Sequence, residues 1–340
     1  MRAHKRRGTR VFRLSLGRIR RAGSSAWRVA TDGGIDGRKN GRCLYILYRR
    51  CEVYMRLSSD EVAGLLRPTV APAKRAGPLE LALRARLSVL MALAQFSHLR
   101  PVEVGAACWP AARSGLQLAQ RCLKRLAEAG EVRGVPNSVG TTSFVLTHTG
   151  TRTLRLHGVC GKHGLNIRSF AGGSFLHHAI NSRYAIEQRN LGHECHTEYG
   201  IAAGFAPFST VTLRRMFKKS CDGLLIRNAR GGPQGSDKLA CIVEVEAARK
   251  PASEIMRILS IADLVGRRID DGQPYVIGGV VFAFNEAQDH EAYIRKTARN
   301  LWHQRPSAER AMLAGRITFA KMRYELPLSF QALTEDTLKL

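Results

Sequence analysis

The sequence predicts a multidomain α+β protein, and three observations lead to this fold class. The chain has 340 residues, which is enough for two or three domains with hydrophobic cores. Its first 67 residues contain short strand-like segments between glycine-rich turns. Helical periodicity begins at Leu79, and apolar strands such as YVIGGVVFAF follow nearer the C-terminus. We therefore expect three regions, with joints at 67–78 and 158–173.

The charge of the chain is strongly unbalanced. Lys and Arg total 54 against 27 Asp and Glu, which gives a formal net charge of +27. Such an excess points to a polyanionic partner, and duplex DNA is the first to consider. An alternative is that the charges only solvate the surface, but the excess is larger than solubility requires.

The first region, residues 1–67, is expected to be a small basic β-rich module. Its predicted strands are VFRLSL, AWRVAT, CLYILY and CEVYMRL, and a helix is expected over SSDEVAGLL. Nothing in this region indicates a particular chemistry.

The second region, residues 79–157, is expected to contain three helices and a β-hairpin. The first helix, ELALRARLSVLMALAQFS, has an apolar stripe formed by Leu83, Leu87, Leu90, Leu93 and Ala94. A short helix around PVEVGAACW follows, and the third helix, ARSGLQLAQRCLKRLAEAG, has a stripe formed by Leu116, Ala119, Leu123 and Leu126. The strands EVRGVP and TSFVLT complete the region.

This order resembles the winged helix-turn-helix class, and the segments LKRLAEAGEV and FVLTHTGTRTL carry the resemblance. In that class the third helix enters the major groove of DNA and the hairpin contacts the backbone or minor groove. The resemblance implies DNA contacts from seven side chains, namely Arg113, Gln117, Gln120, Arg121, Lys124, Arg125 and Arg133. The alternative is a winged helix that binds another protein.

The third region, residues 170–327, is expected to be an α/β domain with a mixed sheet covered on both faces. Its predicted order is the helix SFLHHAINSRYAIEQRNLG, the strands ECHTEYGI, CDGLLIR and KLACIVEVEAA, the helix SEIMRILSIADLVGRRIDDG, the strand QPYVIGGVVFAF and the helix EAQDHEAYIRKTARNLWHQ. The segment ITFAKMRYEL is expected to add an edge strand.

Two glutamates lie in the otherwise apolar strand KLACIVEVEAA. Because strand side chains alternate between faces, Glu244 and Glu246 share one face with Ile242, while Val243 and Val245 face the other. Two neighbouring carboxylates repel each other unless a cation or a proton lies between them. Asp222, at the start of the preceding strand, would complete an oxygen-rich site for Mg²⁺ or Mn²⁺. The alternative is an exposed strand end, where the glutamates pair with Arg249, Lys250 or Arg257.

An aspartate followed about twenty residues later by Glu-x-Glu resembles the core of the PD-(D/E)XK nucleases. The resemblance implies that Asp222 and Glu244 hold the metal ion. The chain departs from the pattern at two positions, because Cys221 replaces the proline and Glu246 replaces the lysine. Either Glu246 is a third metal ligand and Lys250 or Arg249 supplies the positive charge, or catalysis has been lost.

Further residues are candidates for the same centre. The nuclease class often has an additional acid before the first strand, and Glu187 is the candidate, with Glu198 as the competing one. Lys250 or Lys219 would polarise the attacking water or neutralise the transition state. We expect His177 to lie near the cleft and contact phosphate.

The helical unit followed by this core also resembles the replication-relaxation family of plasmid and conjugative-element proteins. HHAINSRYAIE, EY, DGLL and EVE carry the resemblance, over about residues 80–290. It implies a role in plasmid replication, DNA relaxation or mobilisation, and does not by itself imply cleavage. The chain is thus expected to be a DNA-binding protein of a plasmid or mobile element with a metal-dependent endonuclease domain, or alternatively a non-catalytic accessory factor or transcription regulator. A transposase endonuclease subunit is a weaker alternative, because there the nuclease core precedes the winged helix.

We expect a cytoplasmic location. The longest apolar run, YVIGGVVFAF at 275–284, has the length of a strand and is far shorter than a membrane-spanning helix. The basic start of the chain also lacks the apolar stretch of a secretory signal peptide.

Overall fold

The computed structural model describes residues 77–159, 173–228, 238–269, 274–325 and 329–340, together with four short strands nearer the N-terminus. Those strands form two antiparallel pairs, β1 (Ile19–Ala22) with β2 (Ala26–Val29) and β3 (Tyr45–Ile46) with β4 (Val53–Tyr54). The predicted strand VFRLSL and the helix expected over SSDEVAGLL lie outside the described residues.

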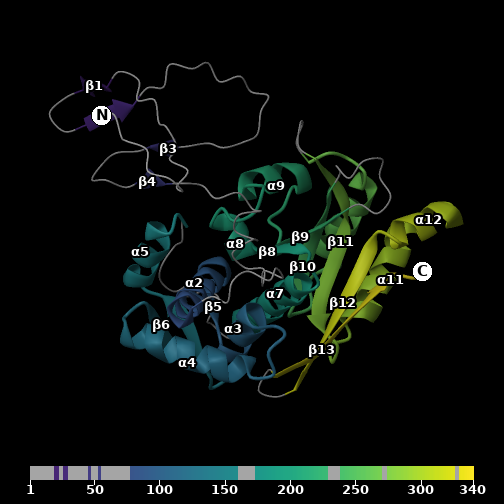
Figure 1. The fold of residues 1–340 in the computed structure, drawn as a ribbon. Coiled ribbons are helices and arrows are strands. Elements are labelled where there is room, and N and C mark those ends of the chain that lie inside the picture. Colours follow the sequence, from purple (N-terminus) through teal and green to yellow (C-terminus); the bar gives the residue numbers. More distant parts are fainter. Residues whose placement is uncertain are drawn as a thin grey trace.

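Residues 78–156 form a group of helices with a small antiparallel sheet (Figure 1). The elements are α2 (Pro78–Phe96), β5 (His98–Leu99), α3 (Pro101–Cys108), α4 (Gly115–Glu128), β6 (Val132–Pro136), β7 (Thr142–Leu146) and α5 (His148–Leu156). The sheet has the order β5-β7-β6. The predicted three helices and hairpin therefore form, and β5 is an additional strand between the first two helices.

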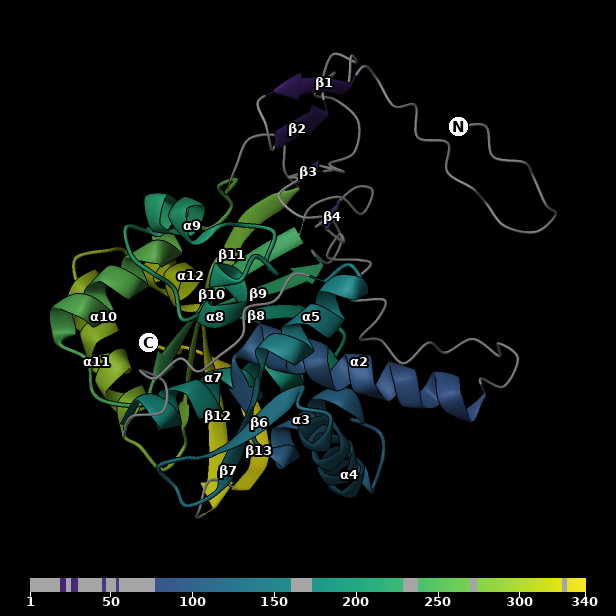
Figure 2. The same cartoon turned by 90° about the vertical axis from the view of Figure 1, so that its left-hand side faces the viewer.

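Burial in this helical group only partly follows the predicted apolar stripes. Leu90, Leu93 and Ala94 are buried, but Leu83 on the same stripe is 41% exposed because the first turns of α2 extend beyond the core. Figure 2 shows this end of α2 projecting from the body of the molecule. On α4, Ala119, Leu123 and Leu126 are buried, whereas Leu116 is 41% exposed.

The remaining described residues form a six-stranded sheet with helices on both faces. Its strands are β8 (Glu194–Thr197), β9 (Gly223–Asn228), β10 (Lys238–Glu246), β11 (Tyr275–Asn285), β12 (Ile317–Glu325) and β13 (Ser329–Thr337). The order across the sheet is β13-β12-β11-β10-β9-β8. The sheet is mixed, because β10, β11 and β12 run parallel while the other neighbours pair antiparallel.

Two apolar clusters cover the two faces of this sheet. On one face α7 (Gly173–Asn190) packs with residues of α2, so one core continues from the helical group onto the sheet. The other face carries the remaining helices, namely α8 (Glu198–Ala202), α9 (Thr210–Phe217), α10 (Ala252–Leu259), the 3₁₀ helix η1 (Ser260–Leu264), α11 (His290–Trp302) and α12 (Ser307–Ala314). The chain is therefore an α+β protein.

The large sheet curls around α7. Arg227 on β9 and Glu335 on β13 form an ion pair with a separation of 2.8 Å, although three strands lie between them in the sheet order. Tyr184 and Gln188 of α7 also donate hydrogen bonds to Glu335, at 2.9 and 2.8 Å. This polar network connects both sides of the sheet to the helix in its concave face.

Several sequence predictions for this part of the chain are wrong in detail. The strand predicted over ECHTEYGI ends at Thr197, because the Thr197 side chain caps α8 by accepting a hydrogen bond from Gly200 N. The helix predicted through residue 272 stops earlier, with η1 ending at Leu264. The segment ITFAKMRYEL forms β12, which is an inner strand because β13 covers its edge. Helices α9 and α12 were not predicted.

None of the helices in the described ranges is both long enough and apolar enough to cross a membrane.

Candidate functional site

Glu244 and Glu246 lie on one face of β10 and are buried. Their side chains have relative exposures of 0% and 1%, and Val243 and Val245 pack into the apolar cluster on the opposite face. The predicted alternation is therefore confirmed. The alternative of an exposed strand end is wrong about exposure but right about one partner, because Lys250 pairs with Glu246 at 2.8 Å and with Glu244 at 3.4 Å. Buried carboxylates require compensating partners, because an isolated charge is costly to remove from water.

Asp222 lies directly before β9 and next to the end of β10, since Gly223 pairs with Val243. Its Oδ2 atom accepts a hydrogen bond from Val245 N at 2.9 Å. The carbonyl oxygen of Asp222 accepts two more, from Asn181 Nδ2 and from Glu198 N, both at 2.6 Å. Backbone and side-chain contacts thus hold Asp222 beside the two glutamates, and we call Asp222, Glu244 and Glu246 the carboxylate cluster.

Two lysines supply the positive charge of the site. Lys250 Nζ lies 2.8 Å from Glu246 Oε1, 3.4 Å from Glu244 Oε2 and 3.7 Å from Asp222 Oδ2. Lys219, in the turn between α9 and β9, is buried and donates a hydrogen bond to Glu244 Oε2. The three predicted acids therefore converge on one point, and that point is the ammonium group of Lys250.

The surroundings change the proton affinity of these groups. Burial, followed by the charge of Asp222, raises the pKa of Glu244 to about 7, against the opposing effect of both lysines. Burial also raises the pKa of Glu246, with Lys250 acting in the opposite direction. Burial lowers the pKa of Lys250, but the three carboxylates together raise it above its usual value. Lys250 is therefore a permanent cation at neutral pH.

Of the other residues predicted for this site, His177 lies next to the carboxylate cluster and Glu187 does not. His177 Nε2 is 3.6 Å from Asp222 Oδ1, and burial lowers the pKa of His177 although Asp222 opposes this. Glu198 starts α8, and burial together with Asp222 raises its pKa. Glu187 instead pairs with Arg183 at 2.6 Å. It lies ten residues beyond His177 on α7, which is about 15 Å along a helix, so the structure does not bring it to the cluster.

The donor set of the cluster suits a hard divalent cation in kind. Mg²⁺ and Mn²⁺ prefer carboxylate oxygens, and the buried Oε1 of Glu244 has no hydrogen-bond partner within the described part of the chain. The positions of the side chains do not match a metal site, because among the described residues no three His, Cys, Asp or Glu side chains are arranged to hold a metal ion. Lys250 stands between the carboxylates, and metal binding would require its ammonium group to move.

The side chains predicted to contact DNA are all exposed. Gln117, Gln120, Arg121, Lys124 and Arg125 of α4 are all exposed, as are Arg113 before the helix and Arg133 on β6. The buried residues of α4 are Gly115, Ala119, Leu123 and Leu126, which occupy the opposite side of the helix. Packing of α4 therefore leaves its polar side available to a partner.

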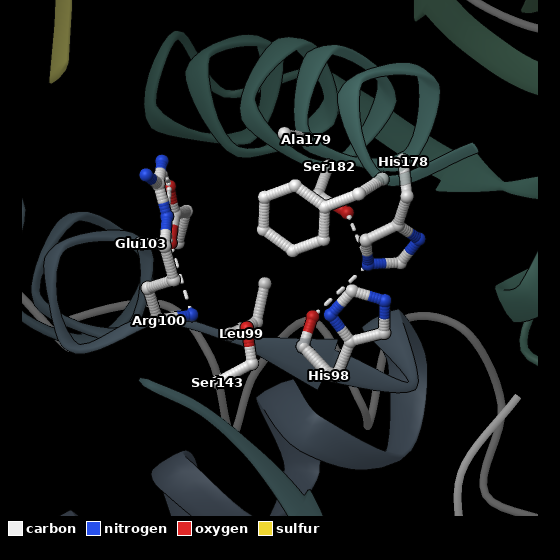
Figure 3. Close-up of a pocket in the computed structure, with 9 residues that line it drawn as sticks. His98, Leu99, Arg100, Glu103, Ser143, His178, Ala179 and Ser182 are labelled. Atoms are coloured by element: carbon white, nitrogen blue, oxygen red, sulfur yellow. Dashed lines mark hydrogen bonds and ion pairs between the residues drawn. The ribbon is translucent and has the colours of Figure 1, made fainter. Parts of the chain in front are cut away.

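A second feature is a small pocket between the helical group and α7 (Figure 3). The rings of His98 and His178 stack there with their centroids 3.7 Å apart, and His178 Nε2 lies 3.0 Å from the carbonyl oxygen of His98. Burial lowers the pKa of His98 to about 2 and that of His178 to about 4. Both rings are neutral at neutral pH, so this pocket is a packed junction between the two parts of the structure.

Sequence reasoning missed Asn181, which anchors the backbone of Asp222. Asn181 follows His177 by four residues, so both lie on one side of α7 and face the start of β9. The four-residue spacing from His177 could have indicated that Asn181 belongs to the site, but only if α7 had been known to pack beside Asp222.

No family model, curated protein or solved structure matches this chain.

Proposed function

We propose that the protein is a DNA-binding protein of a plasmid or other mobile element, and that the carboxylate cluster is a metal-dependent phosphodiesterase centre of the PD-(D/E)XK type. The observation that carries the proposal is the convergence of Asp222, Glu244 and Glu246 on Lys250 at the ends of two adjacent strands. The likeness to the replication-relaxation family, described above from sequence motifs, gives the proposed biological setting.

In this centre Asp222 and Glu244 would hold Mg²⁺ or Mn²⁺, with Glu246 as a third oxygen donor. A bound ion of this type supplies an activated water and stabilises charge on the phosphoryl oxygens. Lys219 keeps the Glu244 carboxylate in place. Lys250 replaces the lysine absent at position 246, since its ammonium group contacts Glu246 and Glu244 directly. His177, next to Asp222, would contact a phosphate oxygen.

The helical group supports the DNA-binding part of the proposal. Its order of α2, β5, α3, α4 and the β6–β7 hairpin resembles that of a winged helix-turn-helix, and in the proposed role α4 would be the recognition helix. Exposed Arg, Lys and Gln side chains on α4 suit phosphates and base edges. The formal net charge of +27 agrees with a polyanionic partner.

A plasmid-nicking assay tests the proposal. The purified full chain is incubated with supercoiled plasmid and Mg²⁺ or Mn²⁺, alongside Asp222→Asn and Glu244→Gln. The wild-type chain should convert supercoiled plasmid to open-circular or linear form, and each variant should lose at least about 100-fold in rate, since each removes a group that would hold the metal ion.

Glu254→Gln is the matched control, because it neutralises an acid on α10 outside the cluster. Its rate should equal that of the wild-type chain. Equal rates in all four proteins would identify a contaminating nuclease, and a wild-type chain without activity would contradict the catalytic proposal.

The second candidate is a non-catalytic DNA-binding accessory factor or regulator with a degenerate nuclease fold. The observation that favours it is that Lys219 and Lys250 already compensate the buried carboxylates. Calorimetric titration with Mn²⁺ separates the two candidates. The catalytic candidate requires Mn²⁺ binding that Asp222→Asn abolishes. Absence of binding together with retained duplex binding would establish the accessory role.

A further inference from the structure

A group of exposed cations lies on α9 and the turn that follows it. Arg214, Arg215 and Lys218 are exposed, whereas the next residue, Lys219, is buried. We call the three exposed residues the α9 basic edge. No Asp or Glu occurs between Glu198 and Asp222, so the neighbouring sequence offers no opposite charge.

The α9 basic edge differs from other cationic positions of the sheet region. Arg183 pairs with Glu187 at 2.6 Å, Arg295 with Glu291 at 2.5 Å and Arg305 with Asp263 at 2.7 Å. Arg214 instead donates a hydrogen bond to the neutral Ser220 Oγ at 2.8 Å. None of the three side chains of the edge has a carboxylate partner within the described ranges. Their charge is therefore available to an external anion.

The edge is held beside the carboxylate cluster by the path of the chain. Leu213 and Phe217 of α9 are buried in the apolar cluster on the sheet face that carries Ile242. Lys218 ends the helix in a left-handed conformation with φ of 55°, and Lys219 then turns inward to Glu244. Three residues further on, Asp222 enters the cluster. The exposed cations thus directly precede the residues that form the site.

We propose that the α9 basic edge binds the phosphate backbone of DNA and holds it beside the carboxylate cluster. This inference rests on the proposed function and adds a second contact surface to the one on α4. Lys219 and Lys250 offset part of the charge of the three carboxylates, and further cations at the rim of the site would reduce the remaining repulsion of an approaching phosphodiester. Arginine suits this task, because its planar guanidinium group donates paired hydrogen bonds to phosphate oxygens.

The same helix is poorly suited to an anionic membrane surface. A helix that lies on a membrane needs an exposed apolar face. In α9 the apolar residues Leu213 and Phe217 are buried in the core, which leaves Val211 as the large hydrophobic residue with a well-exposed side chain. The chemistry of the edge therefore fits a nucleic-acid backbone.

Salt-dependent DNA binding tests the inference. The full chain is compared with the triple variant Arg214→Gln, Arg215→Gln, Lys218→Gln in fluorescence anisotropy titrations of a labelled duplex at several KCl concentrations. Each lost phosphate contact reduces the slope of log K against log salt by about 0.9, so the slope should fall by about 2.7.

A matched triple variant controls for bulk charge. Arg257→Gln, Lys296→Gln and Arg299→Gln remove the same charge from exposed positions of α10 and α11. This variant should retain the wild-type slope. The single variant Arg215→Gln, with a slope reduced by about 0.9, provides the same test if the triple variant folds poorly.

The outcomes are distinct. Wild-type binding with an unchanged slope in both α9 variants overturns the inference and leaves the proposed function intact. A wild-type chain that does not bind duplex overturns both. Equal losses in the two triple variants show that bulk charge acts without a defined surface, which also overturns the inference. The same variants are also tested for binding to phosphatidylserine vesicles. An α9 triple variant that loses vesicle binding but keeps duplex binding likewise overturns the inference.

Discussion

Glu244 has no exposed surface, yet two lysines reach the same oxygen of its side chain. A buried ion pair costs much of its attraction in lost hydration, and removing only one partner leaves an uncompensated charge. The Lys219–Glu244 pair therefore adds little to the free energy of unfolding, although removal of one partner should lower that free energy strongly.

Lys219→Met should destabilise the protein by about 3 kcal/mol, which is the lower end of the cost of breaking a buried pair because Lys250 still contacts Glu244. Urea unfolding followed by circular dichroism measures this change. The double variant Lys219→Met, Glu244→Leu removes both charges and should recover most of the loss. A double variant that is less stable than the single one would contradict this account of the pair.

The raised pKa of Glu244 makes stability depend on pH. In the native state the pKa of Glu244 is about 7, whereas in the unfolded chain its pKa is near the ordinary value of 4.5. The native state therefore binds more protons between these values, and the contribution of Glu244 to stability falls as pH rises from 4.5 to 7.

Glu244→Gln removes this titration. As pH rises from 4.5 to 7, the unfolding free energy of the wild-type protein should fall relative to that of Glu244→Gln. Urea unfolding of both proteins at several pH values measures it, and the comparison cancels the titrating groups that do not interact with Glu244. A difference that stays constant from pH 4.5 to 7 would contradict the raised pKa.

At the scale of single elements, the segment LTHTG leads into α5, and its contacts explain why this sequence pattern indicates a helix that follows the hairpin. Thr147 caps the helix by accepting a hydrogen bond from Gly150 N at 3.2 Å and donates one to the carbonyl oxygen of Gly130 at 2.6 Å. A Cβ atom on Gly150 would lie 2.2 Å from the carbonyl oxygen of Glu131. Leu146 and Leu154 are buried on either side. The motif therefore encodes a close approach of α5 to the start of β6.

Gly150→Ala should destabilise the protein by roughly 3 kcal/mol, because the added methyl group must displace backbone in a packed region. Gly140→Ala is the comparison, since Gly140 has φ of 73° with open space around its Cβ position. It should cost roughly 1 kcal/mol from the left-handed conformation alone. Thermal unfolding of both variants measures the difference, and equal losses would show that the close contact is absent.

The order of elements was predictable wherever periodicity was strong. Helices α2, α4 and α7 and strands β9, β10 and β11 form where their apolar patterns indicated. The predictions failed where local capping or neighbouring strands decide the outcome. Thr197 ends β8 by capping α8, and β13 makes β12 an inner strand. Neither effect is visible in a hydrophobic pattern, because it depends on which segments pair.

At the scale of the whole molecule, one apolar core connects the helical group to a face of the large sheet. It contains Leu90 and Phe96 of α2 together with Tyr184 of α7 and Val243 of β10. The Arg227–Glu335 ion pair connects β9 and β13 across the concave side of the sheet. This packing fixes the position of α7 and hence of His177 and Asn181 beside Asp222.

The sequence by itself determined the α+β class, the excess of positive charge and the placement of Glu244 and Glu246 on one face of a strand. These properties depend on composition and local periodicity, which a linear chain displays directly. The tertiary structure alone decided that Lys219 and Lys250 reach the cluster and that Glu187 lies far from it. Such contacts depend on turns and packing between distant segments, and a one-residue change in where a helix ends redirects the side chains that follow.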